Sequence, residues 1–109
     1  MPRGSHLGEF EYLIMLALLR LKDDAYGMQV RREIQARTDR SVTIGSVYAT
    51  LDRLEKKSLA VSAAGMDEAG RARKYFRVTP EGAGAMRSHL EAMEGMTEGL
   101  PLRRELDAL

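Results

Sequence analysis

Apolar residues recur along residues 44–57 at steps of three and four, the spacing that places side chains on one face of a helix. These apolar positions are Ile44, Val47, Tyr48, Leu51 and Leu54. Small polar and basic residues fall on the opposite face: Ser46, Thr50, Arg53 and Lys57. We therefore predict a helix that buries one side and presents the other to a polar partner.

Two short segments after this helix have the alternation of β-strands. Residues 59–65 alternate weakly and residues 72–79 alternate better, with a glycine- and charge-rich loop at 66–71. The pattern predicts a hairpin whose loop is longer than a tight turn. Tyr75 and Phe76 must face opposite sides of the second strand, so one packs inward and the other is partly exposed. A helix with a polar face followed by a basic hairpin suits the major groove of DNA with a wing beside it.

Two further helices are predicted ahead of this unit. Residues 8–22 are apolar almost all the way round the helix, so more than one side must be covered. The second helix is expected over about residues 25–38, with a buried face formed by Tyr26, Val30 and Ile34. Asp23 or Asp24 is expected to cap that second helix, and Thr43 to cap the helix at 44–57.

A last helix is predicted from Thr79, Pro80 and Glu81, which supply a hydroxyl cap, a first-turn proline and a favourable charge. Over residues 80–100 a heptad seam follows: Ala83, Met86, Leu90, Met93, Thr97 and Leu100. Because the first helix is too apolar for so small a domain to cover, we expect this seam to pack on a second copy. The residues expected in that homodimer interface are Phe10, Leu13, Ile14, Ala17, Met86, Leu90, Met93, Thr97 and Leu100. For residues 101–109, both a short helical extension and a frayed tail remain open.

Composition limits the class of protein. With 109 residues, 44% of them hydrophobic, the chain has the size of one domain. It has no cysteine, so a disulfide framework and thiol chemistry are excluded. We expect no cofactor and no metal site, and a cytoplasmic protein without contact to membranes, because no signal-peptide pattern or bilayer-length apolar run occurs. Residues 1–6, MPRGSH, resemble the remnant of a cleavable affinity tag and are left out of the fold prediction.

Charge is distributed unevenly along the chain. The formal net charge is only +1, but residues 37–77 hold nine basic and five acidic residues. Residues 78–109 hold three basic and six acidic residues. The positive potential is therefore concentrated in the predicted helix at 44–57 and its hairpin, which favours binding to nucleic acid.

Several segments together resemble the PadR family of bacterial transcriptional regulators in its short form. They are LGEFEYLIMLALL at 7–19, AYGMQVRREI at 25–34, GSVYATLDRLEKKSL at 45–59 and GRARKYFRVTPEG at 70–82. The resemblance implies a mainly α fold with a small β-hairpin wing: a winged helix-turn-helix DNA-binding domain at 7–79 and a C-terminal dimerisation helix at 80–100. Two positions depart from the family, Ser58 where glycine is usual in a turn and Phe76 where tyrosine is common.

The same resemblance implies a homodimer joined through the C-terminal helix and the first helix. It implies a repressor of promoters with near-palindromic operators, relieved by a small-molecule effector or by stress. The sequence itself does not identify an effector. Met15, Met86 and Met93 suit a flexible ligand pocket, but ordinary core packing explains them better.

Ten residues are predicted to contact double-stranded DNA: Thr43, Ser46, Tyr48, Ala49, Thr50, Arg53, Lys57, Arg71, Arg73 and Lys74. Arg53 suits bidentate contact with guanine, and Thr50 suits a thymine methyl group or a base acceptor. For Tyr48, core packing and phosphate contact are equally good interpretations. Arg71, Arg73 and Lys74 suit phosphate or minor-groove contact.

Two other classes of function are weighed against DNA binding. A winged-helix module that binds only protein is compatible with the near-neutral net charge. An enzyme is not supported, because the chain shows no Ser-His-Asp set, HExxH motif or phosphate loop.

Overall fold

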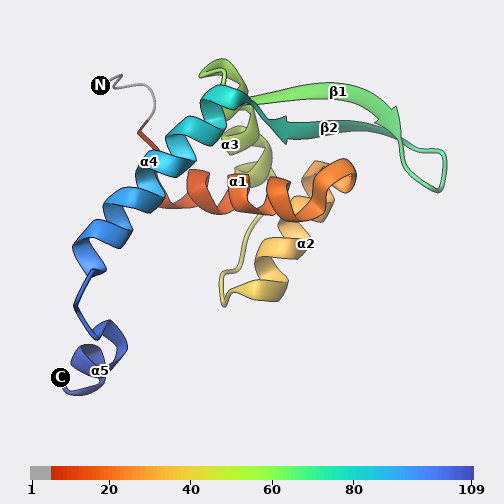
Figure 1. The fold of residues 1–109 in the computed structure, drawn as a ribbon. Helices are drawn as coiled ribbons and strands as arrows, with labels where there is room; N and C mark the ends of the chain where they lie inside the picture. The colour runs from red at the N-terminus through yellow and green to blue at the C-terminus, as the bar shows by residue number, and fades with distance from the viewer. Residues whose placement is uncertain (1–5) are drawn as a thin grey trace.

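The computed structural model describes residues 6–109 and consists of helices with one two-stranded antiparallel sheet (Figure 1). The elements, in chain order, are α1 (Glu9–Leu21), the short 3₁₀ helix η2 (Lys22–Asp24), α2 (Gly27–Arg37), α3 (Ile44–Lys56), β1 (Ala60–Met66), β2 (Ala72–Val78), α4 (Pro80–Thr97) and α5 (Leu102–Asp107). This order confirms the predicted mainly α fold with a hairpin wing. The assignment of residues 1–6 to a tag remnant lies, apart from His6, outside the described residues.

The core lies where α1, α2 and α3 pack on one another. Its largest fully buried side chains are Ile14, Met15, Val30, Val47, Leu51 and Leu54. Burial of side chains of this size contributes about 1.5–3 kcal/mol each relative to exposure. The apolar faces predicted from helical periodicity in α2 and α3 are therefore the faces that form the core.

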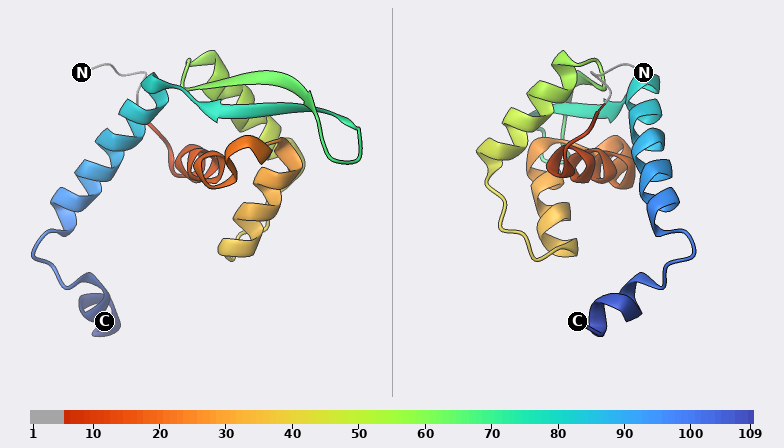
Figure 2. Two further views of the ribbon diagram at one scale, coloured as in Figure 1. Left: turned by 45° about the vertical axis from the view of Figure 1, so that its right-hand side comes forward. Right: turned by 90° about the vertical axis from the view of Figure 1, so that its left-hand side faces the viewer.

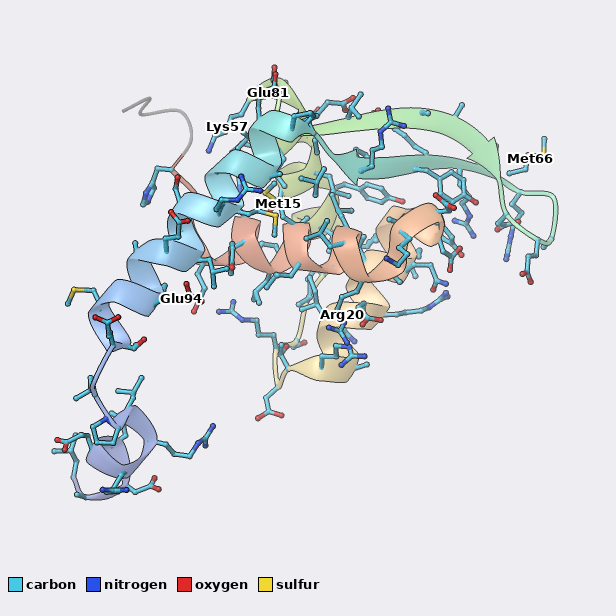
Figure 3. All side chains as sticks on the ribbon, in the orientation of Figure 1. Met15, Arg20, Lys57, Met66, Glu81 and Glu94 are labelled. Atoms are coloured by element: carbon cyan, nitrogen blue, oxygen red, sulfur yellow. The ribbon has the colours of Figure 1, made fainter. Side chains whose placement is uncertain are left out.

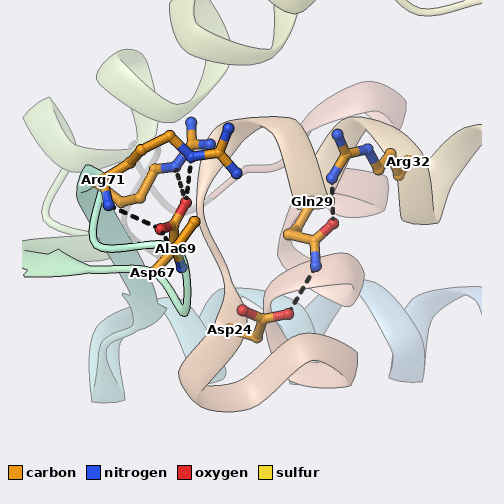
Figure 4. Close-up of polar contacts among 7 residues, drawn as sticks. Asp24, Gln29, Arg32, Asp67, Ala69 and Arg71 are labelled. Carbon is orange, nitrogen blue, oxygen red and sulfur yellow. Dashed lines mark hydrogen bonds and ion pairs between the residues drawn. The ribbon is translucent and has the colours of Figure 1, made fainter.

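Local capping explains where α3 and α4 begin. The side chain of Thr43 accepts a hydrogen bond from the Ser46 N–H at 3.1 Å, and that of Thr79 accepts one from the Gly82 N–H at 2.9 Å. Both predicted caps are confirmed. The predicted cap of α2 is wrong: Tyr26 precedes its first turn without a side-chain cap, and Asp24 instead accepts a hydrogen bond from Gln29 Nε2 at 2.7 Å (Figure 4).

The hairpin extends from the helical body as a long ribbon (Figures 1 and 2). Its register pairs Ala60 with Val78 and Met66 with Ala72. Phe76 is buried, and its N–H donates to the Ala25 carbonyl at 2.9 Å, which joins the hairpin to the start of α2. Ser58, just before β1, has a φ of 63°, the left-handed conformation in which a side chain is strained.

The C-terminal helices project from the body on the side away from the hairpin (Figures 1 and 2). Only the first turns of α4 pack on the body: Gly82, Ala85 and Met86 are buried, and the His89 ring lies 4.3 Å from that of Tyr12. From Leu90 to Leu109 every residue is exposed. Residues 102–107 form the short helical extension that the sequence left open.

The predicted dimer interface requires correction. Three of its residues are buried in the protomer's own core: Ile14 and Ala17 of α1, and Met86 of α4. Helix α4 also ends at Thr97, so Leu100 lies beyond it. Within residues 6–109, no helix has the length and apolarity needed to cross a bilayer.

Candidate nucleic-acid interface

The outer face of α3 presents small and basic side chains to solvent. Thr43, Ser46, Ala49 and Arg53 are all exposed on it. Ser46 is held by two hydrogen bonds with the capping residue, one through its N–H and one from its hydroxyl to the Thr43 carbonyl at 2.8 Å. We call this face, together with the basic side chains of the hairpin, the α3–wing surface.

Thr50 does not belong to that surface. Its exposed fraction is 3%, and its hydroxyl oxygen accepts a hydrogen bond from Arg53 Nη2 at 3.3 Å. The residue lies three positions after Val47 and four before Leu54, so the same helical periodicity places it on the buried side. The prediction that Thr50 contacts a base is therefore wrong.

Tyr48 both packs and remains accessible. Its ring lies over Gly27 at the start of α2, where a Cβ atom would approach the ring carbons within 2.5 Å. Gly27 is therefore a position of close packing between α2 and α3. Tyr48 nevertheless remains 45% exposed to solvent. The two alternatives considered for Tyr48 are thus compatible, since the ring packs while part of the residue faces solvent.

A buried carboxylate from α1 joins the basic end of α3. Glu11 accepts hydrogen bonds from the Gly8 N–H at 2.9 Å, Lys57 Nζ at 2.9 Å and Arg53 Nε at 3.3 Å. Burial acts to raise the pKa of Glu11, but these hydrogen bonds and the charge of Lys57 outweigh it and lower the pKa. The carboxylate is therefore ionised at neutral pH and holds both cations.

A second carboxylate organises the wing. Asp67 accepts hydrogen bonds from the backbone N–H groups of Ala69 and Arg71 and from the guanidinium groups of Arg71 and Arg73, all at 2.9–3.0 Å (Figure 4). The Arg73 guanidinium also lies 4.5 Å from the centre of the Tyr26 ring. The hairpin loop is thus closed around a single side chain.

These contacts predict an acid-resistant wing. The backbone N–H of Arg71, with the two guanidinium groups, lowers the pKa of Asp67 from 3.8 to about 2 despite opposing desolvation. Because the folded-state pKa is depressed, the stability it contributes is present above pH 3.8 and is lost as the pH falls through about 2. We expect a midpoint near 2 when the Asp67 carboxyl is followed by NMR during acid titration. A midpoint near 3.8 would show that the loop does not hold the carboxylate.

The cations predicted to contact DNA are therefore paired within the protein. Lys74 Nζ lies 3.6 Å from Glu55, whose pKa is lowered chiefly by a hydrogen bond from the Ser62 hydroxyl. Lys57 lies directly after α3, and Met66 lies at the far end of the hairpin (Figure 3). The pairing carboxylates Glu11, Glu55 and Asp67 were missed by sequence reasoning. Only for Asp67 did the sequence contain a local indication of such a pair, because Asp67 lies in the predicted loop four residues before Arg71.

The surface has no arrangement suited to metal chemistry. Among the residues that the structure describes, no three His, Asp or Glu side chains are placed to hold a metal ion. An exposed polar helix beside a basic two-stranded wing defines a winged helix-turn-helix protein.

Comparison with known proteins identifies the family. Residues 15–88 match the Transcriptional regulator PadR-like family. An uncharacterised protein of Lysinibacillus sphaericus is 39% identical over 71 residues, which cover 63% of this chain and 64% of that protein. The chain thus matches less than two thirds of the length of this curated relative.

Solved structures with a similar fold include regulators of the same family. A PadR family transcription regulator from Clostridium difficile R20291 superposes with a TM-score of 0.72 and 26% identity, covering 84% of this chain and 93% of that one. A PadR-like transcription factor from Bacteroides fragilis gives a TM-score of 0.69 and 26% identity, covering 82% and 84%. The chain belongs to the PadR-like family, whose members are transcriptional regulators and not enzymes.

Proposed function

We propose that the protein is a sequence-specific, DNA-binding transcriptional repressor that acts as a homodimer in the cytoplasm. The α3–wing surface is the DNA-binding site. The residues that contact the major groove are Thr43, Ser46, Tyr48, Ala49 and Arg53. Those that contact phosphates or the minor groove are Lys57, Arg71, Arg73 and Lys74. The observation that carries this proposal is the exposed polar face of α3, which stands beside the basic hairpin in a fold shared with transcriptional regulators.

The C-terminal arm supports the dimer. Leu90 and Met93 are exposed on α4, and Leu102 and Leu106 are exposed on α5. Between α1 and α2, a groove of about 380 Å³ is lined by Leu13, Leu16, Leu19 and Ile34, together with charged residues such as Arg20, Glu33 and Arg37. Apolar surface of this extent is usually covered by a partner. In a dimer with two-fold symmetry, α3 and its symmetry mate would bind two half-sites separated by one or more helical turns of DNA. One turn corresponds to about 34–36 Å.

The proposal is tested by selecting bound duplexes from a random DNA library with the purified protein at near-physiological salt, followed by sequencing. We expect enrichment of an inverted repeat, which would identify the operator. Enrichment of a single, unrepeated site would contradict the dimeric arrangement. A folded protein that enriches no sequence would contradict sequence-specific binding.

Arg53 is predicted to read a base. We expect Arg53→Ala to weaken binding to the selected operator by about 1–3 kcal/mol while leaving binding to random duplex largely unchanged, because base contacts carry specificity. Glu11 keeps its partners Lys57 and Gly8 in this variant, so no buried charge is left alone. Fluorescence anisotropy with both duplexes measures the difference.

Arg103→Ala is the matched control for Arg53→Ala. It removes the same charge from the exposed helix α5, at the other end of the molecule from α3 (Figure 1). We expect little change in either affinity. If Arg53→Ala weakens operator and random duplex equally, Arg53 contacts phosphate and reads no base.

One observation favours a second candidate function, a winged-helix module that binds protein only. The five cations predicted to contact DNA already have carboxylate partners, which lowers the potential that attracts DNA. The salt dependence of binding separates the candidates. For DNA binding, log K falls with log salt with a slope of about −0.9 per phosphate contact. A protein-binding module shows no such DNA affinity.

A further inference from the structure

The position of Glu11 suggests a role in DNA recognition that needs no contact with DNA. The residue lies in the first turn of α1, yet it bonds with Arg53 and Lys57, which are more than forty residues away in the chain. Its exposed fraction is 6%, so it lies beneath these cations and not beside them on the surface. One carboxylate thereby joins the helix of the proposed dimer interface to the recognition helix.

The carboxylate itself is fixed in orientation. Its Oε1 accepts the Gly8 N–H, while Oε2 accepts both cationic side chains. A carboxylate bound through both oxygens has little freedom to rotate. It therefore presents a constant direction to the side chains that bond to Oε2.

Arg53 is held along one edge only. Its Nε donates to Glu11 and its Nη2 donates to Thr50 Oγ1 at 3.3 Å. A guanidinium group has five N–H donors, so three of them remain at its outer end. The side chain as a whole is still 52% exposed. The anchored inner edge leaves an outer fork that can meet a guanine edge.

Fixing this side chain has two consequences for binding. First, an arginine ordered in the free protein loses less rotamer entropy on binding, and it favours sequences that match its direction. Second, the Glu11 charge offsets part of the positive field of Lys57 and Arg53, which weakens attraction to phosphates of any sequence. The first consequence raises the ratio of specific to non-specific affinity, whereas the second lowers the affinity for DNA of every sequence.

We propose that Glu11 is a positioning residue that sets the sequence selectivity of the recognition helix by orienting Arg53 and restraining Lys57. The inference rests on the proposed DNA-binding function. It predicts that removing the Glu11 charge makes the protein bind DNA more tightly in general but less selectively.

The test compares Glu11→Gln with Glu9→Gln. In Glu11→Gln, the amide side chain keeps an oxygen to accept the Gly8 N–H but loses the charge that holds the cations. Glu9 lies in the same turn, and its side chain is 79% exposed. It pairs with Arg40, in the loop before α3, and not with Arg53 or Lys57. The two variants thus make the same change in net charge. Affinities are measured for the selected operator and for random duplex, over a range of salt concentrations.

For Glu11→Gln we expect tighter binding to random duplex, a steeper salt dependence, and a fall of about tenfold in the ratio of operator to random affinity. For Glu9→Gln we expect that ratio to remain unchanged. Equal ratios in the two variants would overturn the proposal. Wild-type protein that shows no salt-dependent DNA binding would instead overturn the proposed function, and with it this inference.

A double-mutant cycle separates positioning from a structural role. With Arg53→Ala already present, Glu11→Gln should no longer lower the ratio, because the side chain that it orients is gone. If the ratio falls as much without Arg53, Glu11 acts on the fold and not through Arg53. Circular dichroism confirms that each variant is folded.

Glu11→Asp serves if Glu11→Gln does not fold. The aspartate retains the charge but is one methylene shorter, so its reach to α3 is reduced. We then expect a lower ratio without tighter binding to random duplex. An unchanged ratio in folded Glu11→Asp would contradict the positioning role.

Discussion

Leu90→Glu is expected to convert the proposed homodimer to a monomer. Leu90 is exposed in the protomer at the middle of the α4 seam, so a second copy would bury it. An unpaired buried charge costs about 3–5 kcal/mol, and two-fold symmetry introduces it twice. Since each 1.4 kcal/mol changes affinity about tenfold, self-association should weaken by about ten-thousandfold or more. Sedimentation equilibrium of the purified variant measures this change.

Ser88→Glu is the control for Leu90→Glu. Ser88 is exposed on the same helix, but lies two residues from Leu90 and so on the opposite side of α4. We expect this variant to remain dimeric. A dimeric Leu90→Glu protein would place the interface elsewhere, and operator binding by a stable monomer would contradict the requirement for two half-sites.

Gly82→Ala is expected to destabilise the fold strongly. A Cβ atom on Gly82 would lie 2.1 Å from the Leu59 carbonyl oxygen and 2.8 Å from the Met15 methyl group. The same Leu59 carbonyl oxygen accepts a hydrogen bond from the Thr79 N–H. The carbonyl therefore cannot move away without disturbing the start of α4. Overpacking of this kind costs about 1–3 kcal/mol and sometimes more. Urea denaturation at a fixed protein concentration measures the loss, because dimer stability depends on concentration.

Gly84→Ala, two residues further along α4, is expected to stabilise the fold. Apart from the adjacent residues and the backbone of its own helix, no heavy atom lies within 4 Å of a Cβ at Gly84, so an alanine fits without strain. Replacing glycine inside a helix should then raise the free energy of unfolding by about 0.5–1 kcal/mol. If both alanine variants are equally stable, the contact between α4 and Leu59 is looser than described.

Local sequence signals correctly predicted most of the fold. The caps at Thr43 and Thr79, the apolar faces of α2 and α3 and the hairpin with its long loop all depend on residues close together in the chain. They could therefore be recognised from spacing and side-chain chemistry alone. The family was also recognisable, because its short segments occur in the right order.

Burial was harder to predict where a helix is covered on several sides. The periodicity of α1 and α4 showed that apolar surface must be buried, but not whether the same chain or a second copy buries it. Ile14, Ala17 and Met86 belong to the protomer's core, whereas Leu90 and Met93 remain exposed. Thr50 was a different error, since its spacing from Val47 and Leu54 already placed it on the inner face.

The sequence by itself determined the helices, the hairpin and the concentration of basic residues between 37 and 77, because these depend on near neighbours and composition. Only the tertiary structure decided which carboxylate each cation meets. Glu11 reaches Arg53 and Lys57 because α1 packs on α3, and Glu55 reaches Lys74 because the hairpin packs beside α3. Such pairs depend on how separate elements pack, a relation that no local pattern of residues encodes.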